Sequence, residues 1–328
     1  MPLVHRAVPE EIRVSNSVTY WPVAPMDLMV GAPIVARLLL GATPVGRVVQ
    51  AAALGAYLGS AVRDWRDRRG IRKIDFRREF GADVRDLVPM PREVREAEVS
   101  TLVDRLNDEF TPQRIPRRQL ATEVDRHLTD YIAGVTGQYV RTSAEVRGFA
   151  FVGLVLPFAV GACDILSGDV TLFRDTGPCE PFVIAHEFTH RKGYWKELHA
   201  QGLAYLALVA SGDPALTQSA RLERLQRNLS VLSANDTSAF TRLLARGGLR
   251  SELGKPLLRL RSSSGPVAPW VAAALRRLYD QRMRLTAQNG ISDYDRGFTD
   301  FLYTFETSAT ARQTPPAAGA VHRRPTAR

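Results

Sequence analysis

Cysteine is nearly absent from this 328-residue chain, which contains only Cys163 and Cys179. Two cysteines make no disulfide framework, so the chain is not a small disulfide-stabilised scaffold. Hydrophobic side chains make up 45% of the sequence, which is enough for one large domain or two modest ones with a buried core. The composition therefore excludes a disordered protein as well.

Lysine is also scarce, and the only lysines are Lys73, Lys192, Lys196 and Lys255. Lysine and arginine together number 44 against 34 acidic residues, which gives a formal net charge of +10. Arginine supplies almost all of the positive charge. A basic chain can favour nucleic acid or an anionic membrane surface. The arginines are scattered, however, and no zinc-knuckle or aromatic-interleaved basic motif accompanies them. We therefore expect no nucleic-acid partner.

Long uninterrupted apolar runs are missing too. The cleanest, Val48–Val62, has fifteen residues, whereas a spanning helix needs about 20. This run is the end of a weakly charged stretch that begins at Pro25. The basic segment Arg63–Arg78 follows directly, and such a segment is expected on the cytoplasmic side of a membrane helix. A soluble helix packed on a domain is the alternative to membrane attachment. Met1–Trp21 is polar and charged, so we expect no signal peptide.

Hydrophobic periodicity predicts an α+β fold that is mostly helical with a small β-sheet. Helical stripes begin after Pro91 and Pro116, strand-like sequence rich in valine and phenylalanine covers 148–173, and helical periodicity returns at Pro181. The expected organisation is an N-terminal tail (1–24), an apolar helical region and candidate membrane anchor (25–65), a helical region (66–145), a second folded domain (146–310) and a disordered tail (311–328).

Three of the six histidines fall within fourteen residues, in the stretch "PFVIAHEFTHRKGYWKELH". Pro181 fits the first position of a helix and Gly193 its C-terminal cap, with no helix breaker between them. On such a helix His186 and His190 project from the same face, one turn apart. Two imidazoles in this arrangement can bind one Zn²⁺ ion.

Glu187 lies about 100° round the helix from His186, where it reaches a water on the metal rather than the metal itself. Ile184 and Phe188 occupy the opposite side and should anchor the helix in the core. This is the His-Glu-x-x-His arrangement of zinc peptidases, in which the metal activates a water and the glutamate acts as general base. Because so short a motif also arises by chance, a metal-free pair of helix-surface histidines is the alternative.

A second helix should begin just after the turn at Gly193, with Glu197 in its first turn. Its carboxylate can complete three protein ligands and leave the fourth position to water. His199 is the competing ligand. The side chains of residues two positions apart on a helix point in directions that differ by about 200°, so only one of these two residues can point at the metal. Glu197 shares a small, partly polar face with Gln201, which favours Glu197 as the ligand and Gln201 as a residue that orients it.

The stretch "EPFVIAHEFTHRKGYWKELHAQGLAYLAL" resembles a bacterial family of uncharacterised, membrane-associated zinc metallopeptidases, a domain-of-unknown-function family. Its signature runs approximately Pro-Phe-Thr-Ile-Ala-His-Glu-Leu-Ala-His-Gln-x-Gly, followed by Glu-x-Glu-Ala-Asn. The match continues to "TAQNGISDYDRGFTDFL" and more loosely to "GFAFVGLVLPF", so it spans most of Val146–Phe305. His199 stands where the second glutamate is usual, and Gln201 replaces the asparagine.

The resemblance implies a gluzincin-like catalytic domain over residues 146–310 that hydrolyses peptide bonds in a protein or peptide substrate. Its zinc ligands would be His186, His190 and Glu197, with Glu187 as the general base. Tyr294, in the returning segment "SDYDR", would donate a hydrogen bond to the developing oxyanion. Since members of the family usually begin with membrane helices, we expect a membrane-associated rather than a purely cytoplasmic protein.

Zincins also bind an extended substrate against an edge strand, for which Gly168–Asp175 is the candidate, with an ordinary internal strand as the alternative. Cys179 is expected to be a small buried thiol rather than a ligand. Two other functional hypotheses stay open. One is a structural or regulatory zinc protein without turnover, and the other is an arginine-rich interaction protein without a metal.

Overall fold

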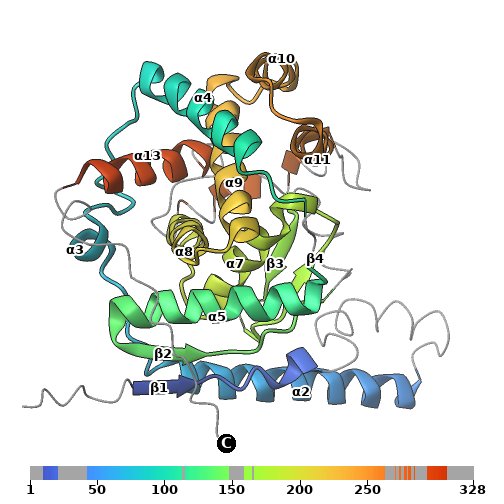
Figure 1. The fold of residues 1–328 in the computed structure, drawn as a ribbon. Coiled ribbons are helices and arrows are strands. Elements are labelled where there is room, and N and C mark those ends of the chain that lie inside the picture. Colours follow the sequence, from blue (N-terminus) through green and yellow to red (C-terminus); the bar gives the residue numbers. More distant parts are fainter. Residues whose placement is uncertain are drawn as a thin grey trace, which may run out of the picture.

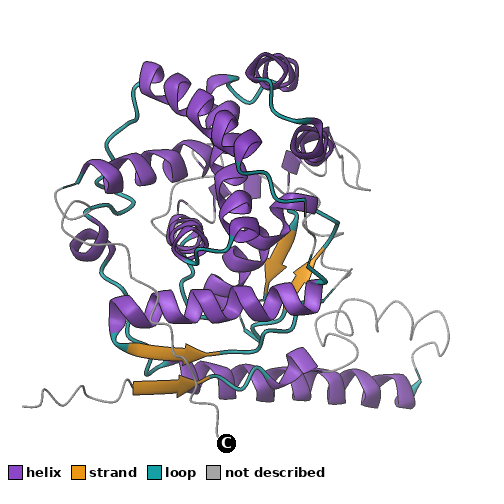
Figure 2. Cartoon of the chain, in the orientation of Figure 1, coloured by secondary structure: helices purple, strands orange, loops and turns teal. Residues whose placement is uncertain are grey.

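The computed structural model describes residues 10–20, 43–112, 115–147, 159–164, 166–262 and 294–308, with isolated helical residues between 270 and 284. This part of the chain is mostly helical with two small sheets, which confirms the expected α+β class (Figures 1 and 2). The helices are α2 (Pro44–Arg68), α3 (Phe76–Phe80), α4 (Arg92–Asp108), α5 (Arg117–Thr136), α7 (Glu180–Arg191), α8 (Glu197–Ala210), α9 (Pro214–Leu232), α10 (Thr237–Gly247), α11 (Ser251–Ser262) and α13 (Tyr294–Thr307), with short 3-10 helices η1 (Ser17–Tyr20) and η2 (Gly177–Cys179).

Each sheet consists of two strands. β1 (Glu10–Arg13) runs parallel to β2 (Gln138–Arg141), so part of the segment expected as an N-terminal tail joins a sheet. β3 (Gly161–Cys163) runs antiparallel to β4 (Val170–Leu172), and Arg147 forms a bridge to Thr171 on the other side of β4. β4 is therefore flanked on both sides, and our prediction of Gly168–Asp175 as the free edge is wrong. Among the described strands, β3 is the outer one.

The core of the molecule is built around α7, all twelve residues of which are buried. Ile184 and Phe188 are 0% exposed, as the helical pattern predicted, and they pack in one cluster with Leu203 of α8 and Phe298 of α13. In Figure 1, α5 passes between α7 and β2, while α9 and α13 lie on other sides of α7 and α8. A buried helix has to satisfy its polar side chains within the protein, which concentrates polar contacts around α7.

Gly202 sets how closely α8 and α13 approach. A Cβ atom at this position would lie 2.7 Å from Cε1 of Phe301, so only glycine lets the aromatic ring rest on the helix backbone. This contact holds α13, which carries Tyr294, close to α8.

Three ion pairs join α13 to helices that lie far away in the sequence. Each contains an arginine of α4 or α9 and a carboxylate of α13, and the pairs are Arg95–Asp300 (2.8 Å), Arg224–Glu306 (2.5 Å) and Arg227–Asp295 (2.5 Å). Arg227 also lies over the ring of Tyr294, 4.7 Å from its centre. These contacts fix the start of α13, and with it Tyr294, against α9.

α2 is the one helix of the described residues that is long and apolar enough to cross a membrane by length and composition. Few of its residues are buried, and they lie mainly in its C-terminal half. Hydrogen bonds tie that half to the rest of the protein, because Asp64 accepts from Ser15 and Asn16 and Tyr57 donates to Asp164. Figure 1 shows α2 running alongside β1 and η1.

Candidate metal centre

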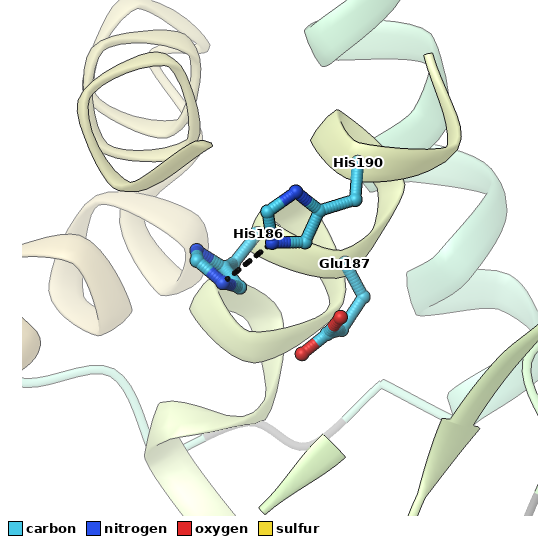
Figure 3. A group of neighbouring side chains, drawn as sticks. All are labelled: His186, Glu187 and His190. Carbon is cyan, nitrogen blue, oxygen red and sulfur yellow. Dashed lines mark hydrogen bonds between the residues drawn. The ribbon is translucent and has the colours of Figure 1, made fainter. Parts of the chain in front are cut away.

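His186 and His190 face each other one turn apart on α7, as their spacing predicted (Figure 3). Their Nε2 atoms lie 3.2 Å apart, and both side chains are more than nine-tenths buried. α7 begins at Glu180, one residue before the predicted Pro181, and ends at Arg191. The rigid helix therefore presents two imidazole nitrogens at one point.

Glu197 brings a carboxylate to the same point from α8, of which it is the first residue. Its Oε2 atom lies 3.1 Å from Nε2 of His186 and 3.6 Å from Nε2 of His190. A tetrahedral metal with ligand bonds of about 2.0–2.1 Å separates neighbouring ligand atoms by about 3.3 Å. The three donor atoms thus already have the spacing that such an ion requires.

Glu187 is a second carboxylate within reach. A ligand atom of Glu187 and the imidazole nitrogens of His186 and His190 all lie within 4.8 Å of one another, so this group could hold a metal ion. The Glu197 oxygen, at 3.1 and 3.6 Å from the two nitrogens, is also at a distance that suits a third ligand. Glu187 lies beside β3, near enough to the backbone N–H of Cys163 for that group to counteract part of the rise that burial causes in the pKa of its carboxyl.

The turn between α7 and α8 makes this arrangement possible. Gly193 has a φ of 92°, which L side chains rarely adopt, and its carbonyl accepts a hydrogen bond from Nζ of Lys73 at 2.8 Å. Nδ1 of His190 lies 2.8 Å from the carbonyl oxygen of Tyr194 in the same turn. Donation from Nδ1–H to that carbonyl leaves Nε2 as the lone-pair nitrogen that faces Glu197.

Burial and the neighbouring charges shift the pKa values of this cluster. Burial raises the pKa of Glu187, which brings this carboxyl closer to the range in which a general base works at neutral pH. Burial opposes protonation of His190, but Glu197 outweighs it and raises the pKa of His190 to about 9. The pKa of Glu197 is lowered well below its usual value despite burial, because both histidines lie beside it. A proton and a metal ion therefore compete for Nε2 of His190.

Tyr294 reaches the same cluster from α13. Its hydroxyl donates a hydrogen bond to Oε2 of Glu197 at 3.3 Å, although the two residues are 97 positions apart in the sequence. The structure therefore brings together all five residues that the sequence selected, namely His186, Glu187, His190, Glu197 and Tyr294.

His199 points elsewhere, as the helical rotation predicted. Its Nε2 atom lies 2.8 Å from Oδ1 of Asp83, and its ring stacks on Phe76 with 3.6 Å between the ring centres. Gln201 is buried, but its side-chain nitrogen makes no hydrogen bond within the described part of the chain, so its orienting role stays a prediction. Cys179 is a free, buried thiol within an apolar cluster of α4, α9 and α10, as expected.

Arg191 and Lys192, directly after His190, are supporting residues that the sequence did not reveal. Both are 0% exposed, although basic residues at the end of a helix usually lie in solvent. Their partners are the carbonyl groups of Ser143, Glu145 and Gly168 for Arg191, and Asp125, Thr129, Val140 and Thr142 for Lys192. These bonds anchor the end of α7, where His190 lies, to β2 and to the loops beside β4.

Comparison with known proteins adds one match. Residues 178–303 match a family model with the description "Protein of unknown function (DUF3810)". The matched segment contains every residue of the candidate centre and falls within the region Val146–Phe305, where the sequence resemblance lay. The description names no activity. No curated protein and no solved structure matches the chain significantly.

Proposed function

We propose that the protein is a zinc-dependent peptidase in which His186, His190 and Glu197 bind the metal. The observation that best supports this function is the convergence of two imidazole nitrogens and one carboxylate oxygen within 3.1–3.6 Å on two rigid, buried helices. Nitrogen and carboxylate donors at tetrahedral spacing suit zinc. The matched family is consistent with this proposal but names no chemistry.

Two features favour a catalytic over a structural zinc site. Structural zinc sites use four protein ligands, whereas catalytic sites use three and leave one position open. Here three donor atoms converge among the described residues, and two further groups with acid–base capacity, Glu187 and Tyr294, stand beside them. A site that only stabilised the fold would need neither group.

Each of these groups has a role in peptide hydrolysis. When bound, zinc supplies a Lewis acid that makes water more acidic and polarises a carbonyl group. Glu187 accepts the proton of the water that attacks the peptide carbonyl and then donates it to the departing amine. Tyr294 donates its hydroxyl hydrogen bond to the oxyanion that develops on the carbonyl oxygen.

The test is metal content together with peptide cleavage in the full chain. We expect about one zinc per chain in the wild type and in His127→Ala, a histidine on α5 outside the centre, and almost none in His186→Ala. Zinc is measured by plasma mass spectrometry, and cleavage by incubation with a peptide library before and after chelation. Undiminished zinc in His186→Ala, or cleavage that survives chelation, would refute the proposal. Bound zinc without cleavage of any peptide would favour the structural or regulatory alternative.

We also propose that the protein is membrane-associated and that α2 lies on the membrane surface rather than across it. The segment Tyr57–Arg68 is fastened to the protein by buried contacts, whereas Gly46 is the one buried residue of Pro44–Ala56 in the part of the chain that the structure describes. Thirteen helical residues extend about 20 Å, less than the roughly 30 Å of a bilayer core. Seven large apolar side chains of α2 are nevertheless exposed, and they are Val45, Val48, Val49, Leu54, Leu58, Val62 and Trp65. Arg47, Arg63, Arg66 and Arg69 near its two ends suit anionic head groups.

Charged substitutions on the exposed face of α2 test this attachment. We expect wild-type protein to float with vesicles that contain phosphatidylserine, and Val48→Glu/Leu58→Glu/Val62→Glu to lose at least about 90% of that binding, because each change removes apolar burial in the lipid. Val94→Glu, an exposed position on α4, is the matched control and should float like the wild type. If the triple variant binds vesicles as well as the wild type does, α2 is not the attachment site.

A further inference from the structure

A pocket of about 300 Å³ opens where the start of α4, the end of α9 and the first turns of α13 meet. Its lining residues are Pro89, Met90, Arg92, Arg95, Val231, Leu232, Arg296 and Asp300. None of them belongs to the candidate metal centre. The set combines three arginines with four apolar side chains and a single carboxylate, so charge and apolar surface are both present.

The positive charges of the pocket exceed its negative charge. Asp300 is already engaged, because it accepts hydrogen bonds from Arg95 at 2.8 Å and from the backbone N–H of Met90 at 3.0 Å. Arg92 pairs with Glu96 at the solvent-exposed surface, where such pairs are weak. Arg296 is exposed and forms no ion pair with any residue that the structure describes. Among the described residues, the positive charge at the rim of the pocket therefore exceeds the negative charge that pairs with it.

Arg95 adds a buried guanidinium to the exposed arginines of the pocket. It is 3% exposed, and its guanidinium is fixed by hydrogen bonds to Asn228, Thr299 and Asp300. A fixed, buried guanidinium loses little side-chain entropy on binding and acts through a lower effective dielectric than one in water. The apolar wall beside it, formed by Met90, Val231 and Leu232, gains from contact with an apolar group.

We propose that this pocket binds a carboxylate attached to a short apolar group. Arginine presents a planar set of donors that matches a carboxylate, and Arg296 and Arg92 stand at the rim to receive it. The pocket is large enough to admit a small organic carboxylate. Free medium-chain fatty carboxylates and the C-terminal apolar residue of a peptide share this chemistry. The site is separate from the proposed peptidase centre, and binding to it does not depend on zinc.

Calorimetric titration of the full chain tests the proposal. The two probes are octanoate, which represents a fatty carboxylate, and N-acetyl-leucine, which represents a peptide C-terminus. We expect at least one of them to bind, and Arg296→Ala to raise its Kd about tenfold or more, as the loss of a charge-assisted hydrogen bond does. The probe with the lower Kd shows whether the ligand is a fatty carboxylate or a peptide C-terminus.

Two controls separate this site from general attraction to a basic protein. Arg118→Ala, an exposed arginine on α5, removes the same charge away from the pocket and should leave the Kd of the probe unchanged. Octanamide, which has the chain without the charge, should not bind. The proposal is overturned if neither probe binds, if Arg296→Ala and Arg118→Ala behave alike, or if octanamide binds as tightly as octanoate.

Discussion

Replacing Glu187 by glutamine is expected to leave zinc bound and to reduce peptide hydrolysis by at least about 10²-fold, the usual loss when a positioned base is removed. Glutamine has nearly the same shape and fits the same buried position. It cannot take up a proton, however. The measurement is kcat/KM on a peptide that the wild type cleaves, together with zinc content for each preparation.

Glu180→Gln is the matched control for this experiment. Glu180 lies on the same helix, but it pairs with Arg117 at 2.7 Å rather than with the metal centre. We expect it to retain both zinc and activity. Full activity in Glu187→Gln would exclude the proposed mechanism. Loss of zinc in Glu187→Gln would instead make Glu187 a ligand, as its position within 4.8 Å of the histidine nitrogens permits.

Glu197→Ala and His199→Ala should have opposite effects on zinc binding. We expect Glu197→Ala to weaken zinc affinity by at least about 10²-fold, since losing even a residue that only orients a ligand costs about 10–100-fold. His199→Ala should keep one zinc per chain at wild-type affinity, because its imidazole pairs with Asp83 and stacks on Phe76. Zinc affinity is measured by competition with a chromophoric chelator.

Thermal unfolding provides the second measurement for this pair. His199→Ala removes a buried ring stack and the polar contact with Asp83, so it should lower the Tm of the metal-free protein, whereas Glu197→Ala should affect the metal-loaded protein most. If His199→Ala loses zinc and Glu197→Ala keeps it, the ligand is His199. That outcome would require α8 to be rotated by about 200° from the orientation seen here.

The sequence by itself determined the local geometry of the metal centre. His186, Glu187 and His190 lie on one helix, and the repeat of that helix fixes the directions of their side chains before any packing is known. The same reasoning placed Glu197 and His199 on different faces of their helix. In the structure Glu197 lies toward His186, and His199 lies toward Asp83. Gly193 also signalled the turn correctly, because a φ of 92° rarely suits another residue.

Only the tertiary structure decided which distant segments meet this helix. It placed Tyr294 on Glu197 through ion pairs between α9 and α13, and it flanked β4 on both sides, by β3 and by Arg147. It also buried Arg191 and Lys192 and fastened half of α2 to the protein. Periodicity reports which face of a helix or strand is apolar, but not which partner covers it. Contacts between residues about a hundred positions apart in the sequence depend on how all the faces pack together, so no local pattern encodes them.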